Sequence, residues 1–323
     1  MNPKIAVVIP CYKVRERISD VIKGIGDEVG RIYVVDDCCP EGTGNHVKAS
    51  VEDPRVRVIF NAENLGVGGA VITGYQAAIA DGAEVIVKID GDGQMNPKLI
   101  PRFTAPILKG QADYTKGNRF YDLANISRMP TARLFGNAVL SFMAKLSTGY
   151  WNIFDPTNGY TAVHSKVAAF LPQDKISRRY FFETDMLFRL NTIRAVVVDI
   201  PMDAVYGDEQ SHLKISGILG EFLFKHAHNL MKRIFYNYFL RDMTLASVEL
   251  VVGSVLFLFG FIFGLAHWIK SVSIGAPTPL GTIMIAAMSV LVGIQLILAF
   301  LGFDILNVPK RPIHDDLPDS HHY

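Results

Sequence analysis

The sequence predicts an α/β domain with a mostly parallel sheet, followed by two membrane-spanning helices. Short apolar runs alternate with helical patterns over residues 1–215, which is the rhythm of a parallel sheet covered on both faces. Two long apolar blocks stand near the C-terminus, and each is long enough to cross a bilayer. Polar clusters directly follow four successive apolar runs, where ligand sites of such sheets lie.

Composition excludes several classes of protein. Half of the 323 residues are hydrophobic, and the 32 basic and 31 acidic residues leave a net charge of +1. This balance gives no electrostatic reason to expect a nucleic-acid partner, and the hydrophobicity excludes a disordered chain. Cys11, Cys38 and Cys39 lack metal-ligand spacing and are too few for a disulfide framework, so we expect free thiols in a reducing compartment.

The elements expected in the first domain follow from these patterns. Short, continuous apolar runs are typical of buried parallel strands, and a proline early in a pattern favours the start of a helix. We expect strands at Ile5–Ile9, Ile32–Val35, Val56–Phe60 and Glu84–Ile89, and helices at Arg15–Ile25, Val67–Ala80, Pro97–Leu108 and Phe181–Thr192.

The four parts of the chain differ in hydropathy. They are a domain at 1–215, a juxtamembrane amphipathic helix region at 216–242, two transmembrane helices within 243–306, and a tail at 307–323. The two apolar blocks, about 245–269 and 280–303, are joined by a short connector and therefore form a hairpin. Gly217–Leu240 combines helical apolar spacing with basic residues, which favours a helix lying on anionic headgroups; a helix packed on the domain is the alternative.

Basic residues predict how the hairpin is oriented. The connector holds Lys270 alone, whereas basic residues flank the hairpin on both sides. These are Lys225, Lys232, Arg233, Arg241, Lys310 and Arg311. The positive-inside rule then places the domain and both termini on the cytoplasmic side of the inner membrane, in a multi-pass protein. The apolar run Ile5–Pro10 is too short for a signal peptide.

Polar residues after the four strands are expected to form one site. They are Pro10-Cys11-Tyr12, Asp36-Asp37, Asn61 with Asn64–Gly69, and Asp90–Gln94. Asp90 and Asp92 are two residues apart, so in an extended segment their carboxylates point the same way, with Gln94 next in register. Such oxygens suit Mg²⁺ or Mn²⁺, although a solvated Asp-Gly turn is the alternative.

The glycine-rich stretch at 66–69 does not indicate a dinucleotide enzyme. Val71 occupies the last position of a Gly-x-Gly-x-x-Gly pattern, and the stretch follows the third strand and not the first. The sequence also contains no Walker loop. These observations argue against NAD enzymes and P-loop NTPases.

The ordered set of motifs resembles family 2 glycosyltransferases with the GT-A fold. The first motifs are Pro10-x-Tyr12, Val35-Asp36-Asp37, Asn64-x-Gly66-x-Gly68-x-Ala70 and Asp90-x-Asp92-x-Gln94. Later motifs resemble the branch that transfers sugars to polyprenyl phosphate, such as dolichyl-phosphate mannose synthases and undecaprenyl-phosphate glycosyltransferases with a two-span hairpin. They are Gly117-Asn118-Arg119-Phe120, Arg133-x-x-Gly136-Asn137, Asp155-x-x-Asn158-Gly159-Tyr160 and Ser211-x-x-Lys214.

The resemblance implies a reaction and its partners. A sugar would move, with inversion, from a nucleotide-sugar to undecaprenyl phosphate at the cytoplasmic membrane face, with Mg²⁺ or Mn²⁺ as cofactor. The donor would be a UDP-hexose or a UDP-N-acetylhexosamine. A GDP-sugar is the alternative, because the sequence does not decide between the two nucleotides. The polyprenyl-phosphate-sugar would serve cell-surface glycan modification, and the enzyme would be a homo-oligomer, with a tetramer as one form.

The resemblance also implies residue roles. Donor binding falls to Pro10, Tyr12, Asp37, Asn64, Gly68, Asp90 and Gln94, and metal binding to Asp90, Asp92 and Gln94. The acceptor phosphate would meet Arg119, Arg133, Ser211 and Lys214, and the catalytic group comprises Asp92, Asp155, Arg119 and Arg133. Asp155 would be a base or an orienting group. Glu183 and Asp185 are alternative bases, or an acidic pair favoured by a helix N-terminus.

Two departures from the family pattern leave the nucleotide preference open. Lys13-Val14 stands where the family often has Asn-Glu, and Asp36-Asp37 is followed by Cys38-Cys39 in place of Gly-Ser. Glu16 is a candidate substitute for the missing acid.

Two other functions agree less well with the sequence. A processive polysaccharide synthase would carry Gln-x-x-Arg-Trp, but neither Trp151 nor Trp268 follows an arginine, and two spans are too few for a polymer channel. An inactive membrane scaffold is disfavoured by the intact Asp90 and Asp92.

Overall fold

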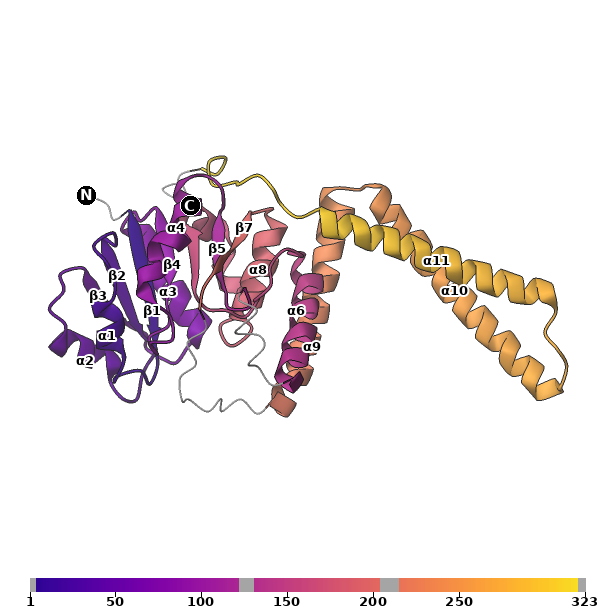
Figure 1. Cartoon of the computed structure of the whole chain (residues 1–323), viewed down its shortest axis with the longest axis horizontal. Helices are drawn as coiled ribbons and strands as arrows, with labels where there is room; N and C mark the ends of the chain where they lie inside the picture. The colour runs from indigo at the N-terminus through magenta and orange to yellow at the C-terminus, as the bar shows by residue number, and fades with distance from the viewer. Residues whose placement is uncertain (1–3, 122–130, 204–214, 319–323) are drawn as a thin grey trace. The chain divides into compact units, whose positions relative to one another are not determined.

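The computed structural model describes residues 4–121, 131–203 and 215–318. The chain divides into two compact units (Figure 1). The first runs to Leu230 and includes the residues from Pro309 onward, and the second is Met231–Val308.

The first unit contains a seven-stranded mixed sheet within the described residues (Figure 1). Its strands are β1 (Ile5–Cys11), β2 (Arg31–Asp36), β3 (Val56–Phe60), β4 (Val85–Lys88), β5 (Tyr114–Asn118), β6 (Thr161–His164) and β7 (Val197–Pro201). The order is β3-β2-β1-β4-β6-β5-β7, and β6 alone among these strands runs antiparallel to its neighbours, β4 and β5. The predicted α/β fold with a mostly parallel sheet is confirmed.

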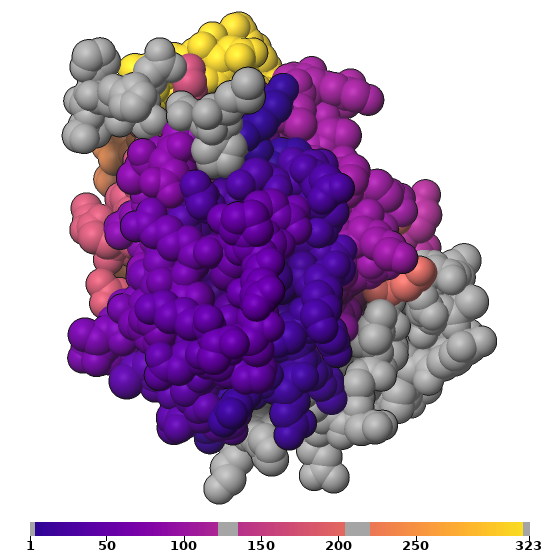
Figure 2. All heavy atoms as spheres, turned by 90° about the vertical axis from the view of Figure 1, so that its left-hand side faces the viewer, coloured from indigo at the N-terminus to yellow at the C-terminus, as the bar shows by residue number. Residues whose placement is uncertain are grey.

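Helices cover both faces of this sheet. The described helices of this part of the chain are α1 (Ile18–Lys23), α2 (Thr43–Ser50), α3 (Val67–Ala80), α4 (Ile100–Leu108), α6 (Thr131–Thr148), α7 (Ser165–Phe170), α8 (Phe182–Thr192) and α9 (Ile215–Phe235). Of these, α6 packs on α8, and α9 contacts α6 through His226 and α8 through Asn229. One apolar core joins α1, α2 and α4 to the face that carries Val7 and Ile9. On the other face, α3 contacts β1 and β2, with Gly74 directly against Val8. In Figure 2 the residues before about 110 form one continuous packed surface.

Two predicted helices begin later than expected. Residues 14–17 form a turn before α1, because the N–H groups of Arg17 and Ile18 both donate to the carbonyl of Val14. Pro97–Leu99 is a separate 3-10 turn before α4. In each case the first residues of the segment form a separate turn, and the α-helix starts only after it.

Parallel pairing brings the polar strand ends to one edge of the sheet. Cys11 of β1 is paired with Asp36 of β2, and Asp36 with Phe60 of β3. β4 pairs with the other side of β1, up to Val8 opposite Lys88. The residues that follow these strands therefore start from neighbouring positions.

One buried carboxylate holds the C-terminal tail within the first unit. Asp113, wholly buried, accepts hydrogen bonds from the N–H groups of Ile313 and His314, and its Oδ1 lies 2.7 Å from Nδ1 of His314. The ring of His314 stacks on His164 at 4.4 Å. Asp113 also accepts from the N–H of Val196, so it ties the tail to the start of β7.

The second unit is a helical hairpin of α10 (Leu245–Ile274) and α11 (Leu280–Leu306). Both helices are long and apolar enough to cross a membrane, and both extend beyond their predicted C-terminal ends. Glycines allow them to approach closely: a Cβ at Gly293 would lie 2.5 Å from the backbone nitrogen of Phe257. Small residues at such crossings are typical of membrane helices.

A buried ion pair holds the base of the hairpin. The guanidinium of Arg233 contacts both oxygens of Asp304, at 2.5 and 3.0 Å, and Tyr238 donates its hydroxyl to Asp304 at 2.6 Å. The Arg233 and Asp304 side chains are only 2% and 3% exposed. The carboxylate thus accepts three hydrogen bonds, from Arg233 and Tyr238, inside the second unit.

Removal of the arginine should destabilise the hairpin. We expect Arg233→Met to cost about 3 kcal/mol, because it removes the cation that faces the buried Asp304 carboxylate. The matched control is Arg311→Met, which breaks an exposed pair with Asp316 and should cost less than about 1 kcal/mol. Thermal unfolding in detergent measures both. Equal losses in the two variants would contradict the role given to the buried pair.

Candidate active site

A cavity of about 500 Å³ lies where the carboxyl ends of β1, β2 and β4 meet. Its lining includes Pro10, Tyr12, Asp37, Asn64, Asp90 and Asp92. Five of the residues expected to bind the donor are therefore brought together. Gly68 and Gln94, also expected there, are not among the lining residues, whereas Arg179 and Tyr180 are. This volume is in the range of small-molecule and cofactor sites.

Asp37 is held by the loop that follows β3. Its Oδ1 accepts from the N–H of Leu65 at 2.9 Å and from the amide of Asn61 at 2.8 Å, and its Oδ2 accepts from the N–H of Gly66 at 2.8 Å. The side chain is buried. Asp37 thus shapes the cavity wall, and its role in recognising a base stays a prediction.

Asp90 is held by a buried lysine that the sequence analysis did not single out. Nζ of Lys88 lies 2.9 Å from Asp90 and 3.2 Å from Oε1 of Glu183, and the lysine side chain is 1% exposed. Burial lowers the pKa of Lys88, but the two carboxylates outweigh it and leave the pKa above its ordinary value. Glu183 therefore serves in an ion pair that joins α8 to the end of β4.

Asp92 lies in the turn after β4 and suits a divalent cation. Its Oδ1 accepts from the N–H of Gln94 at 2.9 Å, so the Gln94 backbone orients the carboxylate. No group of three candidate metal-binding side chains of the His, Cys, Asp or Glu type occurs in the described parts of the chain. A cation on Asp90 and Asp92 would then complete its shell with donor phosphate oxygens and water, as Mg²⁺ usually does.

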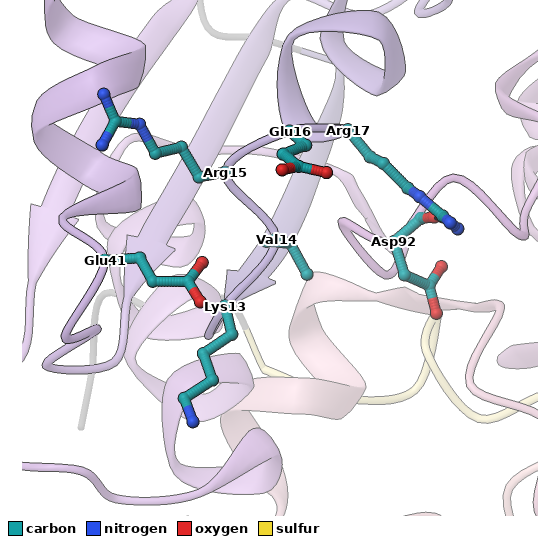
Figure 3. A pocket seen from close by; sticks show the side chains of 7 residues that line it. All are labelled: Lys13, Val14, Arg15, Glu16, Arg17, Glu41 and Asp92. Atoms are coloured by element: carbon teal, nitrogen blue, oxygen red, sulfur yellow. Dashed lines mark hydrogen bonds between the residues drawn. The ribbon is translucent and has the colours of Figure 1, made fainter. Parts of the chain in front are cut away.

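A second hollow, of about 470 Å³, adjoins Asp92 (Figure 3). It shares Val14 and Asp92 with the first cavity and is otherwise lined by charged side chains of the loop after β1 and by Glu41. Glu16 lies here and not in the first cavity. Nη1 of Arg17 donates to the backbone carbonyl of Asp92 at 3.1 Å, which ties this loop to the Asp-x-Asp turn.

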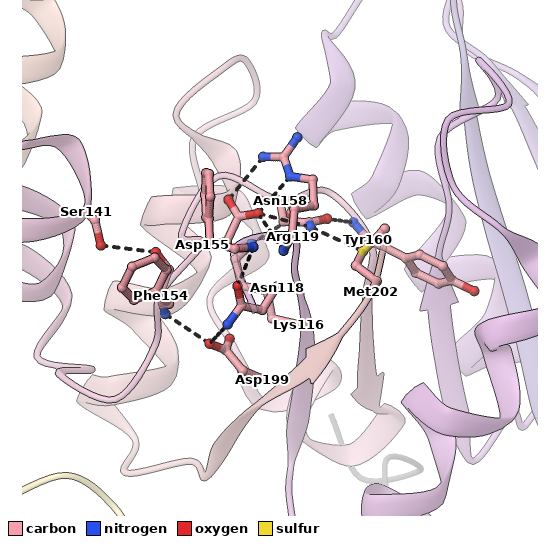
Figure 4. Close-up of polar contacts among 11 residues, drawn as sticks. Lys116, Asn118, Arg119, Ser141, Phe154, Asp155, Asn158, Tyr160, Asp199 and Met202 are labelled. Atoms are coloured by element: carbon pink, nitrogen blue, oxygen red, sulfur yellow. Dashed lines mark hydrogen bonds and ion pairs between the residues drawn. The ribbon is translucent and has the colours of Figure 1, made fainter. Parts of the chain in front are cut away.

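Arg119 and Asp155 form a close ion pair at the end of β5 (Figure 4). Nε of Arg119 lies 2.7 Å from Oδ2 of Asp155, and Nη2 lies 3.1 Å from Oδ1. Asn158 donates to the same carboxylate at 3.3 Å. Asp155 is 1% exposed and Arg119 is 37% exposed. The arrangement favours the orienting role for Asp155 over the base, because both its oxygens are occupied.

Two further buried ionisable groups surround this pair (Figure 4). Lys116 donates to the carbonyl of Asn158, and burial lowers its pKa to about 8. Asp199 accepts from the amide of Asn118 at 3.2 Å and from the N–H of Phe154 at 3.0 Å. Burial raises the pKa of Asp199 to about 6, against the effect of the Phe154 hydrogen bond.

Asp185 holds three segments together. Its Oδ2 accepts from the N–H of Ser177 at 2.8 Å and from Nε of Arg189 at 3.3 Å, and its Oδ1 accepts from the amide of Asn229 at 3.1 Å. The carboxylate is buried. These contacts favour a structural role for Asp185 over that of a base.

Several expected acceptor-binding residues cannot be placed around this site. Ser211 and Lys214 lie outside the described residues, and the side chain of Arg133 on α6 does too. Lys88, Lys116, Asp199 and Arg179 were missed from the sequence. Lys88 interrupts the apolar run at 85–89, and Asp199 interrupts the one at 195–200. These interruptions were the available signals, but the partners of both residues are distant in sequence.

Ionisation of Asp199 should reduce stability. Its folded pKa of about 6 exceeds the ordinary 3.8, so the unfolding free energy should fall as pH rises through this interval. The whole shift corresponds to about 3 kcal/mol. Asp199→Asn should remove this pH-dependent loss of stability. Thermal unfolding in detergent should show the variant equal to wild type near pH 4 and more stable at pH 7. A stability difference between the variant and wild type that does not change with pH would contradict the assignment.

Comparison with known proteins agrees with this architecture. The family model "Glycosyl transferase family 2" matches residues 6–170. An undecaprenyl-phosphate mannosyltransferase of Micrococcus luteus is 29% identical over 222 residues, covering 68% of this chain and 90% of that protein. A UDP-N-acetylglucosamine–dolichyl-phosphate N-acetylglucosaminyltransferase of Methanococcus voltae is 27% identical, covering 62% and 86%.

A solved structure shows the same fold. Glucosyl-3-phosphoglycerate synthase of Mycobacterium tuberculosis, crystallised with Mn²⁺, UDP and glucosyl-3-phosphoglycerate, matches with a TM-score of 0.52 and 20% identity. The match covers 72% of this chain and 80% of that one. The family model spans more than half of the chain and includes β1 to β4 with the cavity at their ends. The chain is therefore a glycosyltransferase of family 2, with a GT-A-like catalytic domain.

Proposed function

We propose that this protein transfers a sugar, with inversion, from a nucleotide-sugar to a polyprenyl phosphate at the cytoplasmic membrane face. The observation that carries the proposal is the single cavity shared by the Asp-x-Asp turn and the ends of β1 and β2. A donor bound there would have its phosphates near Asp90 and Asp92. The acceptor would be undecaprenyl phosphate, and the product would serve cell-surface glycan modification.

The relatives support the acceptor class and leave the sugar open. One is named for undecaprenyl phosphate and mannose, and another for dolichyl phosphate and N-acetylglucosamine. A polyprenol monophosphomannose synthase of Mycolicibacterium smegmatis is 27% identical over 201 residues. The names share a polyprenyl phosphate and differ in the sugar, so we propose a hexose or N-acetylhexosamine donor with UDP as the first nucleotide to test.

Asp92 and Asp90 would hold Mg²⁺ or Mn²⁺ together with the donor diphosphate. When bound, the cation supplies positive charge where the leaving diphosphate becomes more negative. Mn²⁺ and UDP in the glucosyl-3-phosphoglycerate synthase crystals support this class of cofactor. Lys88, which Asp90 shares with Glu183, stabilises the Asp90 carboxylate in the absence of donor.

The acceptor phosphate would bind Arg119, which Asp155 holds in place. A planar guanidinium suits phosphate oxygens because it offers paired donors. The nucleophile is an oxygen of a phosphate monoester, whose second pKa of about 6 leaves it mostly dianionic at pH 7. It therefore needs no general base, which agrees with a carboxylate that is already paired.

An apolar stripe on α6 favours approach to a bilayer. Phe135, Val139 and Phe142 are spaced at helical intervals and are 72%, 43% and 53% exposed. The hydroxyl of Ser141, on the same helix, donates to the carbonyl of Phe154, next to Asp155 (Figure 4). The α6 stripe would thus contact the lipid chain in the membrane, and the neighbouring segment at Asp155 would lie near its phosphate.

The proposed topology keeps the domain and both termini cytoplasmic. The contact of His314 with Asp113 supports it, because a tail that follows two spans reaches the domain only from the same side. The cytoplasmic side itself rests on the positive-inside rule. The homo-oligomer stays a prediction.

Lipid-dependent release of a nucleoside diphosphate tests the function. Purified enzyme with Mn²⁺ or Mg²⁺, undecaprenyl phosphate and a panel of nucleotide-sugars should release UDP or GDP from one donor only when the lipid is present. Asp92→Asn should lower this rate at least about a hundredfold, because a catalytic cation site loses its charge. Release that does not depend on the lipid, or no release from any donor, would count against the proposal.

The role of Asp155 has a separate kinetic test. Asp155→Asn should raise the KM for the lipid about tenfold, through a loosened Arg119, and change kcat less than about threefold. A general base would instead lose about a hundredfold or more in kcat. Steady-state kinetics with varied lipid distinguish the two outcomes.

A further inference from the structure

The glycine motif at the start of α3 receives a protein carbonyl. The N–H groups of Gly68 and Gly69 donate to the backbone carbonyl of Arg178, at 2.8 and 3.3 Å. These are donors of the first helical turn, which would otherwise be open to an anion. They are used by the loop before α8, so Gly68 does not offer its N–H to donor phosphate in this arrangement.

The close approach of this loop explains why glycines stand there. A Cβ at Gly66 would lie 2.6 Å from the carbonyl oxygen of Arg178, and one at Gly68 would lie 2.6 Å from that of Ser177. Gly66 also has a φ of +82°, a conformation that side chains disfavour. Both positions therefore need glycine for contact with residues 177–178.

The same loop is held from its other side. The N–H of Ser177 donates to Asp185 at 2.8 Å, and the N–H of Phe182 donates to the carbonyl of Arg179 at 2.8 Å. The loop is thus fixed on both sides of Arg179 and Tyr180. Both residues line the cavity that holds Asp90 and Asp92.

Charge distinguishes Arg179 within this cavity. Among the described residues that line it, Arg179 is the one basic side chain. Asp90 is paired with Lys88, and Asp37 accepts three hydrogen bonds from the β3 loop. No hydrogen bond or ion pair within the described part of the chain engages the Arg179 guanidinium. Arg119, by contrast, is held by Asp155.

We propose that Arg179 binds the diphosphate of the nucleotide donor, and that the Gly66–Gly69 motif positions Arg179. The motif does so through the hydrogen bonds from Gly68 and Gly69 to the Arg178 carbonyl, a contact that we call the latch. This rests on the proposed function, since it names a residue for the same donor. The guanidinium would donate to phosphate oxygens of a donor in the cavity that it shares with Asp92. It would bind the leaving diphosphate more strongly as negative charge develops, and no covalent step is involved.

Nucleotide affinity tests the proposal without the transfer reaction. Calorimetry on the full chain in detergent, with Mn²⁺, would use UDP, GDP and UMP. Arg179→Gln should weaken binding of the preferred nucleoside diphosphate about tenfold or more, and binding of the monophosphate less. Arg178→Gln is the matched control, because its carbonyl makes the latch while its side chain does not line the cavity. It should change affinity less than about twofold.

The latch has its own variant. Gly66→Ala keeps Arg179 but forces the loop away, so nucleoside diphosphate affinity should fall about as far as in Arg179→Gln. Gly110→Ala is the matched control, since Gly110 has a φ of +64° and an added Cβ would meet nothing within 4 Å. Thermal unfolding would verify that each variant is folded. Unchanged affinity in a folded Gly66→Ala would overturn the latch.

The outcomes separate this proposal from the proposed function. If wild type binds no nucleoside diphosphate, the proposed function fails. If wild type binds one and transfers sugar while Arg179→Gln binds equally well, the assignment of Arg179 alone is overturned. Equal losses in Arg178→Gln and Arg179→Gln would also overturn it, because they would reflect only the general charge of the loop.

Discussion

The site depends on charged side chains that are paired at the ends of β4 and β5. Lys88 is the centre of this arrangement, because its buried ammonium contacts the carboxylates of both Asp90 and Glu183 and so joins the sheet to α8. A buried charge without a partner would cost several kcal/mol. The position of the first carboxylate of the Asp-x-Asp turn is therefore coupled to the packing of a helix far along the chain.

The second pair, between Arg119 and Asp155, is the one that the proposed function assigns to the acceptor phosphate. Asp155 uses both oxygens on Arg119, and the guanidinium remains more than a third exposed. A phosphate dianion needs a positive partner and no proton acceptor, so an arginine fixed by a buried carboxylate suits it better than a free base. In the proposed function, donor and acceptor phosphates would meet two different cations, Arg179 and Arg119, supplied by different loops.

Connections between distant segments recur at the edges of the catalytic unit. Asp185 joins the loop before α8 to α9 through Ser177 and Asn229. Asp113 joins the C-terminal tail to β7 through His314 and Val196. In both cases one buried carboxylate accepts backbone and side-chain donors from separate elements and so fixes those elements to one another.

The sequence by itself determined the α/β class, four strands with their polar ends, and two apolar helices, because these features follow from local periodicity and length. It also indicated Asp90, Asp92, Arg119 and Asp155 through the order of motifs. Only the tertiary structure decided which charges pair, since Lys88 meets Glu183 across 95 residues and His314 meets Asp113 across 201. It also decided that the glycine motif receives the Arg178 carbonyl. Such partners are chosen by packing in three dimensions, and local patterns do not encode them.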